Sequence, residues 1–204
     1  MIVVLGRPAL GNARMGVPAR AEGIVARIAL AAATAGAVVE LVGTVGDDER
    51  ADALTVALGR AGVGHAALLR VPGAVTPAPG APASSLPRLE AADVDLGLRY
   101  VPECRVLVLG EPLSPGVTAV ALEAAAYHGA MVVAIVASDV AVGPALGAAT
   151  VLSAPADEGA PFAELVGGYA ARLDAGVESG PAFREAAHAV GWEPVPRGVG
   201  EGAV

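Results

Sequence analysis

The stretch that decides the fold is GAVVELVGTVGDDERADALTVALGRAGV, residues 36–63. Its β-branched first half predicts a buried strand over residues 38–42 that ends at Gly43. The Ala- and Leu-rich second half predicts a helix over residues 48–61, with acidic residues in its first turn. Gly62 stands just past the end of that helix, where glycine commonly terminates helices. The segment therefore predicts a strand–turn–helix unit.

The turn between this strand and helix is Gly43-Thr44-Val45-Gly46-Asp47-Asp48. Glycine at position 43 allows the backbone to come close to whatever lies above the carboxyl edge of the sheet. Gly46 permits a tight turn, and the side chain of Asp47 or Asp48 can accept hydrogen bonds from the first N–H groups of the helix. Two interpretations therefore stay open for the two carboxylates, a turn and capping role or a contact with a ligand.

The same alternation continues on both sides of this unit. Further strands are predicted at residues 2–5, 65–71, 105–109, 131–136 and 150–152, and further helices at residues 19–35, 91–100, 115–128, 161–175 and 181–190. Continuous apolar strands joined by helices predict an α/β fold, with a mostly parallel sheet covered by helices on both faces. We expect one domain over residues 1–191, interrupted by a Pro/Gly-rich loop at residues 72–87 and followed by a loose tail at residues 192–204.

The composition excludes several classes of function. All 13 basic residues are arginine, against 21 acidic residues, so the net charge is −8. A chain without lysine has no Walker-type phosphate lysine and forms no Schiff base. An acidic chain with scattered arginines is a poor nucleic-acid binder. Cys104 is the only cysteine, which excludes a disulfide framework and suits a reducing cytoplasm. Because no stretch is long and apolar enough for a membrane span or a signal peptide, we expect a cytoplasmic protein with no membrane partner.

Two segments resemble the PfkB (ribokinase-like) carbohydrate kinases. Residues 36–63 are similar to that family's strand–GxVGDD–helix segment, and residues 105–136 to its later strand–helix–strand unit. The resemblance covers about two-thirds of the chain and implies a shortened ribokinase-like fold. It also implies a small-molecule substrate of sugar or nucleoside type, with ATP and Mg²⁺ as the cofactors if the protein is an active kinase.

The chain departs from the family where the family binds sugar. The family's Asp after the first strand falls on Gly11. The family's Gly-Gly-x-x-x-Asn motif, which grips sugar hydroxyls, falls on Glu22, Gly23 and Arg27. Arg27 is then either a surface arginine on an Ala-rich helix or, in the sharper interpretation, a guanidinium that favours a phosphate or carboxylate ligand.

The family's Gly-Ala-Gly-Asp turn, which supplies an anion hole and a catalytic Asp, is not found. One alignment places the catalytic Asp at Ala160, beside Pro161, which has no N–H. The other sets residues 151–158 against the family's Asn-x-x-Glu segment. That alignment retains Glu158 as a cofactor-binding residue and puts Pro155 at the asparagine. A general base contributes about 10²–10⁴ in rate, and an oxyanion-type donor about 10²–10³. We therefore expect lost or weak phosphotransfer and assign no catalytic residue.

Three hypotheses for the function follow. The first is a sugar- or nucleoside-binding protein of this family, with Gly43, Arg27, Asp47 and Glu111 as candidate substrate-binding residues. The second is a structural or regulatory partner protein that forms a homodimer through residues 71–87. The third is an active sugar kinase with a rebuilt site, in which Glu111 or Asp139 at a strand end acts as the base. The three histidines stand in separate elements, so no metal site is predicted.

Overall fold

Seven parallel strands form the central sheet of the protein in the computed structural model, which describes residues 1–13, 15, 18–138, 143–155 and 160–192. The strands of this sheet are β1 (Ile2–Leu5), β4 (Val39–Gly46), β5 (Val63–Gly64), β6 (Leu68–Val71), β7 (Val106–Leu109), β8 (Met131–Ala137) and β9 (Thr150–Ala154). Two short strands, β2 (Ala9–Leu10) and β3 (Ala21–Glu22), form a separate antiparallel pair.

The strand order places β1 at the point where the chain changes direction across the sheet. From β1 the chain moves outward to β4, which pairs with both β5 and β6. It then returns to the other side of β1 and adds β7, β8 and β9 in turn. Leu5, the last residue of β1, pairs with Val42 on one side and Leu109 on the other. In open α/β sheets, such a reversal leaves a crevice at the carboxyl ends of the strands.

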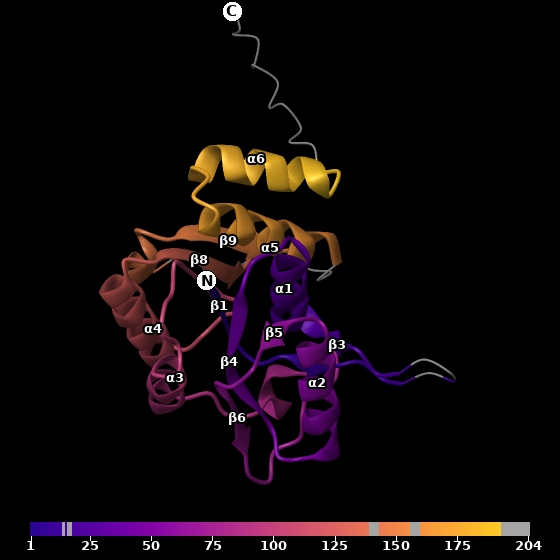
Figure 1. The fold of residues 1–204 in the computed structure, drawn as a ribbon. Coiled ribbons are helices and arrows are strands. Elements are labelled where there is room, and N and C mark those ends of the chain that lie inside the picture. Colours follow the sequence, from indigo (N-terminus) through magenta and orange to yellow (C-terminus); the bar gives the residue numbers. More distant parts are fainter. Residues whose placement is uncertain (14, 16–17, 139–142, 156–159, 193–204) are drawn as a thin grey trace, which may run out of the picture.

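Helices cover both faces of the sheet (Figure 1). They are α1 (Gly23–Thr34), α2 (Glu49–Arg60), α3 (Ala91–Leu98), α4 (Pro115–His128), α5 (Ala160–Asp174) and α6 (Ser179–Ala189). Alternate side chains of β1 point to opposite faces of the sheet. Ile2 and Val4 pack with α1, α2 and α5 on one face, whereas Val3 and Leu5 pack with α3 and α4 on the other. This two-sided burial explains why the strands read as continuous apolar runs.

The predicted fold class is confirmed, and several element ends differ from the prediction. The helix predicted from residue 19 begins at Gly23, because Ala21 and Glu22 pair with β2 and Gly23 has a positive φ of 73°. The strand predicted to end at Gly43 continues to Gly46, because β6 pairs with its second half and supplies the hydrogen bonds. Residues 72–87, predicted as a loop, hold one 3-10 turn at Ala83–Ser85 and no other helix or strand.

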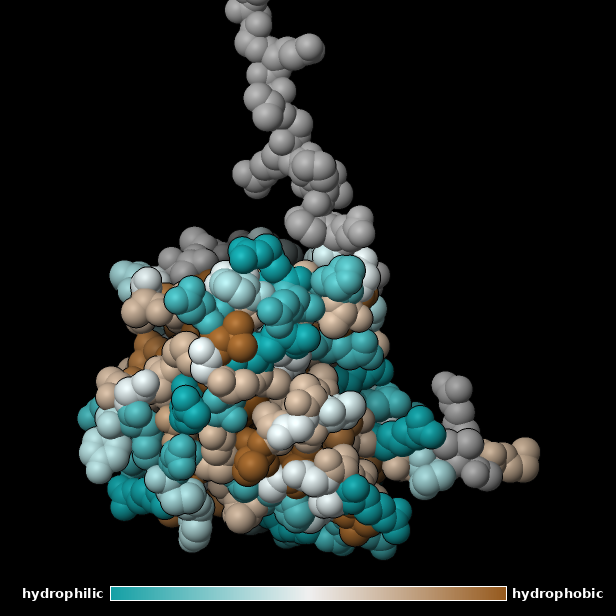
Figure 2. Space-filling model, turned by 45° about the horizontal axis from the view of Figure 1, so that its top comes forward, coloured by the Kyte–Doolittle hydropathy of each residue, from teal (hydrophilic) through white to brown (hydrophobic). Residues whose placement is uncertain are grey.

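The surface mixes apolar and polar residues. On the face that Figure 2 shows, hydrophobic residues stand in small separate patches among hydrophilic ones. Within the described ranges, no helix is long and apolar enough to cross a membrane. The one-domain prediction stays a prediction, and nearly all of the predicted loose tail lies outside the described residues.

Candidate functional site

A pocket of about 750 Å³ opens at the carboxyl edge of the sheet, beside the point where the strand order reverses. Three parts of the chain form its walls. They are the start of α1, the loop between Pro77 and Leu86, and a set of strand-end residues, which follow β1 and β7, lie at the ends of β8 and β9, and include Ala9 of β2. The volume falls within the range of about 300–1,000 Å³ that is typical of small-molecule sites.

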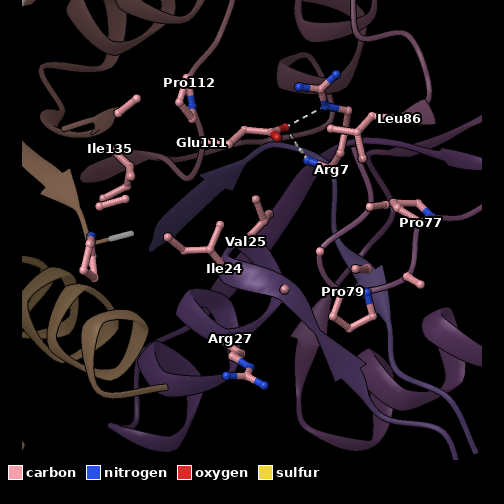
Figure 3. A pocket seen from close by; sticks show the side chains of 18 of the residues that line it. Arg7, Ile24, Val25, Arg27, Pro77, Pro79, Leu86, Glu111, Pro112 and Ile135 are labelled. Carbon is pink, nitrogen blue, oxygen red and sulfur yellow. Dashed lines mark hydrogen bonds and ion pairs between the residues drawn. The ribbon is translucent and has the colours of Figure 1, made fainter. Parts of the chain in front are cut away.

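An ion pair between Arg7 and Glu111 joins the two strands on either side of the reversal (Figure 3). Arg7 lies two residues after β1 and Glu111 two residues after β7. Glu111 Oε1 accepts hydrogen bonds from both the backbone N and the Nε of Arg7, each at 2.8 Å. The side chains are only 18% and 12% exposed. Two charge-assisted hydrogen bonds to one oxygen fix this carboxylate in the pocket wall.

Arg27 lines another part of the same pocket. It lies on α1, between the buried residues Ala26 and Ile28, and its own side chain is partly exposed. Figure 3 shows it on the far side of Ile24 and Val25 from the Arg7–Glu111 pair. Among the residues that the structure describes, Arg27 has no carboxylate within ion-pair distance.

Asp48 holds the loop that forms the rim of the pocket. Its Oδ1 accepts from the backbone N of Ala51 at 2.9 Å and so caps α2. The same carboxylate accepts from the backbone N of Thr76 at 2.9 Å and from the Thr76 hydroxyl at 2.6 Å. Partial burial on its own raises the pKa of Asp48, but these hydrogen bonds and the charge of Arg50 outweigh it, so the pKa lies below its ordinary value of 3.8.

Arg50 adds a second tie between α2 and the rim. Its Nε donates to the carbonyl oxygen of Thr76 at 3.2 Å, and its Nη2 donates to the carbonyl oxygen of Leu10 in β2. The backbone N of Leu10 in turn donates to the carbonyl oxygen of Pro77 at 3.0 Å. The first turn of α2 therefore anchors both the loop and the β2–β3 pair next to the pocket.

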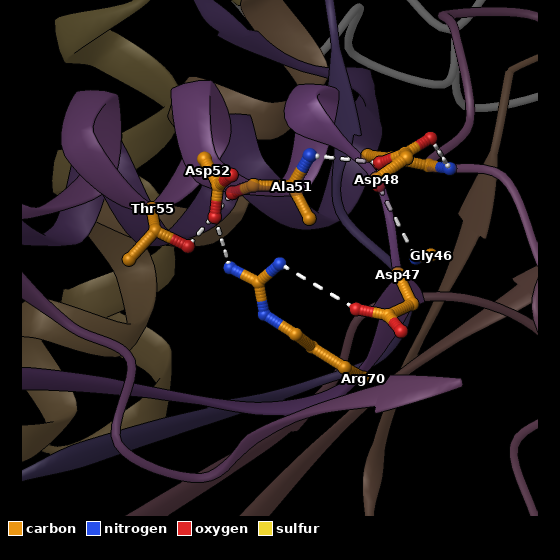
Figure 4. A network of polar contacts seen from close by, with 8 residues as sticks. Gly46, Asp47, Asp48, Ala51, Asp52, Thr55 and Arg70 are labelled. Carbon is orange, nitrogen blue, oxygen red and sulfur yellow. Dashed lines mark hydrogen bonds and ion pairs between the residues drawn. The ribbon is translucent and has the colours of Figure 1, made fainter. Parts of the chain in front are cut away.

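Asp47, the neighbour of Asp48, points elsewhere. Figure 4 shows its side chain facing Arg70 of β6, which also pairs with Asp52 on α2. The Arg70–Asp47 distance is 3.9 Å, and the Asp47 side chain is 54% exposed. Pairs this exposed contribute little to stability. Asp47 is not among the residues that line the pocket.

Known proteins match this chain in structure and not in sequence. No family model matches the sequence, and no curated protein is significantly similar to it. Solved structures match over nearly the whole chain. Arabidopsis thaliana ribokinase, complexed with ribose and ATP, has a TM-score of 0.66 at 14% identity, covering 93% of this chain and 90% of that one. A PfkB protein from Polaromonas sp. JS666 has a TM-score of 0.67 at 13% identity, covering 94% of both chains. An apo putative ribokinase II from E. coli has a TM-score of 0.64 at 12% identity, covering 91% of this chain and 90% of that one.

The fold is ribokinase-like. At 204 residues, the chain is a shortened version of it. The resemblance inferred from the two sequence segments is thereby confirmed as a likeness of fold. Identities of 12–14% do not carry residue roles with them, so the site is interpreted from its own geometry.

The ribokinase-like fold brings two of the candidate residues, Arg27 and Glu111, to the pocket wall and leaves Gly43 away from it. Gly43 lies inside β4, where a Cβ atom would stand 1.8 Å from the carbonyl oxygen of Gly6. Only glycine fits so close to a neighbouring backbone. A Cβ atom at Gly11 would likewise stand 2.6 Å from the carboxyl carbon of Glu22, so that carboxylate fills the space beside Gly11.

The described residues give the pocket few groups for phosphotransfer. Glu111 is the only carboxylate among the pocket-lining residues that the structure describes. In the described part of the chain, no three His, Cys, Asp or Glu side chains gather around a place for a metal ion. Glu158 and Asp139 lie outside the described residues, and α5 begins at Ala160 and Pro161.

Sequence analysis missed Arg7 and the loop from Pro77 to Leu86 as parts of the site. The loop was predicted only as a loop or as a dimer contact. The signal for Arg7 was its place two residues after the first strand, at the same edge of the sheet as Glu111. Two strand-end residues of opposite charge meet only if their strands are adjacent, and the sequence pattern does not give the strand order.

Proposed function

We propose that this protein belongs to the PfkB (ribokinase-like) carbohydrate kinase family, binds a sugar- or nucleoside-type small molecule in the pocket, and has weak or absent phosphotransfer activity. The observation that carries the binding proposal is the pocket itself. It lies at the reversal of the strand order, where open α/β sheets bind ligands. The carboxylate fixed in its wall is suited to accept hydrogen bonds from hydroxyl groups.

The neighbouring structures support the class of ligand. The Arabidopsis ribokinase was solved with ribose and ATP, and the E. coli putative ribokinase II also with ATP and Mg²⁺. Both share the fold at high coverage. Weak or absent transfer is supported by the lining residues, since their single described carboxylate is already paired with Arg7. A general base must be free to accept the substrate's proton.

Calorimetric titration with a panel of sugars and nucleosides, each with a phosphorylated or acidic counterpart, tests the binding proposal. We expect saturable binding of at least one compound. A Glu111→Gln variant should bind it about tenfold more weakly. The glutamine still accepts hydrogen bonds from Arg7, but its NH₂ group then faces the pocket in place of a carboxylate oxygen. The matched control is Glu103→Gln, which makes the same change at an exposed position. Absence of binding by every compound, or equal effects of the two variants, contradicts the proposal.

A second candidate function is an active kinase with a rebuilt site, in which Glu111 is the base. The observation that favours it is the position of Glu111 in the pocket wall. It requires the Arg7–Glu111 pair to open when substrate binds. This function predicts protein-dependent phosphate transfer that Glu111→Gln abolishes and Glu103→Gln leaves unchanged.

A further inference from the structure

We propose that the ligand of this pocket carries a negatively charged group, a phosphate or a carboxylate, and that Arg27 binds it. The inference rests on the proposed binding function and names the chemical class of the ligand. It begins from the charges that the pocket presents. Its charged lining residues, among those described, are Arg7, Arg27 and Glu111.

Two of these three charges cancel. Arg7 and Glu111 share two hydrogen bonds of 2.8 Å, and both side chains are largely buried. Arg27 is left as the uncompensated charge of the described lining, in a chain whose net charge is −8. An arginine without a carboxylate partner among the described residues favours an anionic ligand at that place in the lining, because a guanidinium pairs with phosphate and carboxylate groups.

The position of Arg27 suits recognition. Its backbone is held in α1, where Ala26 and Ile28 are fully buried, so the guanidinium extends from a fixed base. The first turn of α1 lines the same wall and carries no acidic side chain, and the nearest acidic residue of this helix is its N-cap, Glu22, which is not among the pocket-lining residues. A guanidinium forms two parallel hydrogen bonds with a carboxylate or a phosphate.

The rest of the pocket fits a hydroxyl-bearing ligand. Glu111 Oε1 is occupied by Arg7, whereas no described residue donates to Oε2. A carboxylate oxygen without a protein donor can accept hydrogen bonds from the hydroxyl groups of a ligand. Arg27 and Glu111 line the same pocket on opposite sides of Ile24 and Val25 (Figure 3), so we expect a ligand with hydroxyls at one end and an anion at the other. The class is therefore a sugar phosphate or a sugar acid.

Calorimetry with matched pairs of compounds tests this class. The probes are ribose with ribose 5-phosphate, glucose with gluconate, and inorganic phosphate alone. The proteins are wild type, Arg27→Met and Arg60→Met. The two variants remove one positive charge each, and Arg60 is an exposed residue on α2, outside this pocket.

We expect wild type to bind an anionic sugar about tenfold to a hundredfold more tightly than its neutral partner. Arg27→Met is expected to lose this preference and Arg60→Met to keep it. Arg27→Gln gives an independent check, since glutamine is also a good helix former and lacks the charge. The affinity for the anionic sugar also falls as salt is raised.

Equal affinities for the neutral and anionic partners contradict the inference and leave the proposed binding function standing. Equal behaviour of Arg27→Met and Arg60→Met also contradicts it. Inorganic phosphate that binds as tightly as the sugar phosphate contradicts the hydroxyl-bearing part of the class. Absence of binding by every sugar contradicts this inference and the proposed function together.

Discussion

Asp48 shows how one residue of the turn motif serves the site without contacting it. Its carboxylate caps α2 and accepts two hydrogen bonds from Thr76, in the loop that leads to the rim of the pocket. The neighbouring Asp47 is exposed and only loosely paired with Arg70. Of the two interpretations that the sequence left open for Asp48, its contacts here are those of capping and turn formation.

The lowered pKa of Asp48 predicts a pH-dependent contribution to stability. Since the folded-state pKa lies below 3.8, the ionised form stabilises the fold at pH values above 3.8, and this contribution is lost as the pH falls through the folded-state pKa. We expect Asp48→Asn to lower the free energy of unfolding at neutral pH by about 1–2 kcal/mol. Urea denaturation at neutral and acidic pH measures this.

Asp47→Asn is the matched control, with an expected change at neutral pH of at most about 0.5 kcal/mol. The difference between wild type and Asp48→Asn should shrink as the pH falls below 3.8. A difference that is independent of pH, or equal effects of the two variants, contradicts the role given to Asp48.

The candidate site could be predicted only in part at the scale of residues. Arg27 and Glu111 were chosen from the sequence, and both line the pocket. Glu111 was found because it stands two residues after an apolar strand. Arg7 has the same signal but no partner in its own neighbourhood of the sequence, since Glu111 is 104 residues away. Long-range pairs of this kind depend on strand order, which short-range patterns do not encode.

At the scale of elements, the contact between α1 and α5 sets the position of the pocket wall. Gly167 of α5 lies against the backbone of α1, where a Cβ atom would stand 2.6 Å from the carbonyl oxygen of Ile28 and 2.6 Å from the Cβ of Ala31. The adjacent Gly168 faces more open space, and the nearest atom to its Cβ position is Nη1 of Arg172 at 3.3 Å. The two helices therefore approach closely through one glycine.

Gly167→Ala should destabilise the fold by about 1–3 kcal/mol, because the added methyl group overlaps backbone that packing holds in place. Gly168→Ala should be neutral or stabilise by up to about 1 kcal/mol, since alanine is the better helix former and a flexible side chain can move aside. Chemical denaturation of the two variants compares them directly. A Gly167→Ala protein as stable as Gly168→Ala contradicts this account of the helix contact.

Most elements follow from sequence periodicity, and the ends that were wrong have a tertiary cause. The helix Pro115–His128 was predicted at both ends, and local residues form these ends in the structure, since Ser114 caps the start, Pro115 opens the first turn and Gly129 follows the last. The end of β4 and the start of α1 depend instead on pairing with β6 and β2, which lie elsewhere in the chain. Residues close to an element in the sequence therefore predict those of its ends that local interactions determine.

At the scale of the whole molecule, a reversal in strand order creates the pocket, and separate parts of the chain supply its charges. The end of β1 carries Arg7, the end of β7 carries Glu111, and α1 carries Arg27. The proline-rich loop closes one side, held there by Asp48 and Arg50. The architecture thus provides a pocket, and its described lining provides a single carboxylate, which is paired with Arg7.

The central claim is that this ribokinase-like chain keeps a binding pocket and has weak or absent phosphotransfer. The most direct measurement is the transfer of radiolabelled γ-phosphate from ATP, with Mg²⁺ present, to the sugars and nucleosides that the protein binds. We predict that labelled product does not rise above the protein-free background, or rises only slowly. Rapid transfer that scales with protein concentration and is abolished in Glu111→Gln would contradict the claim.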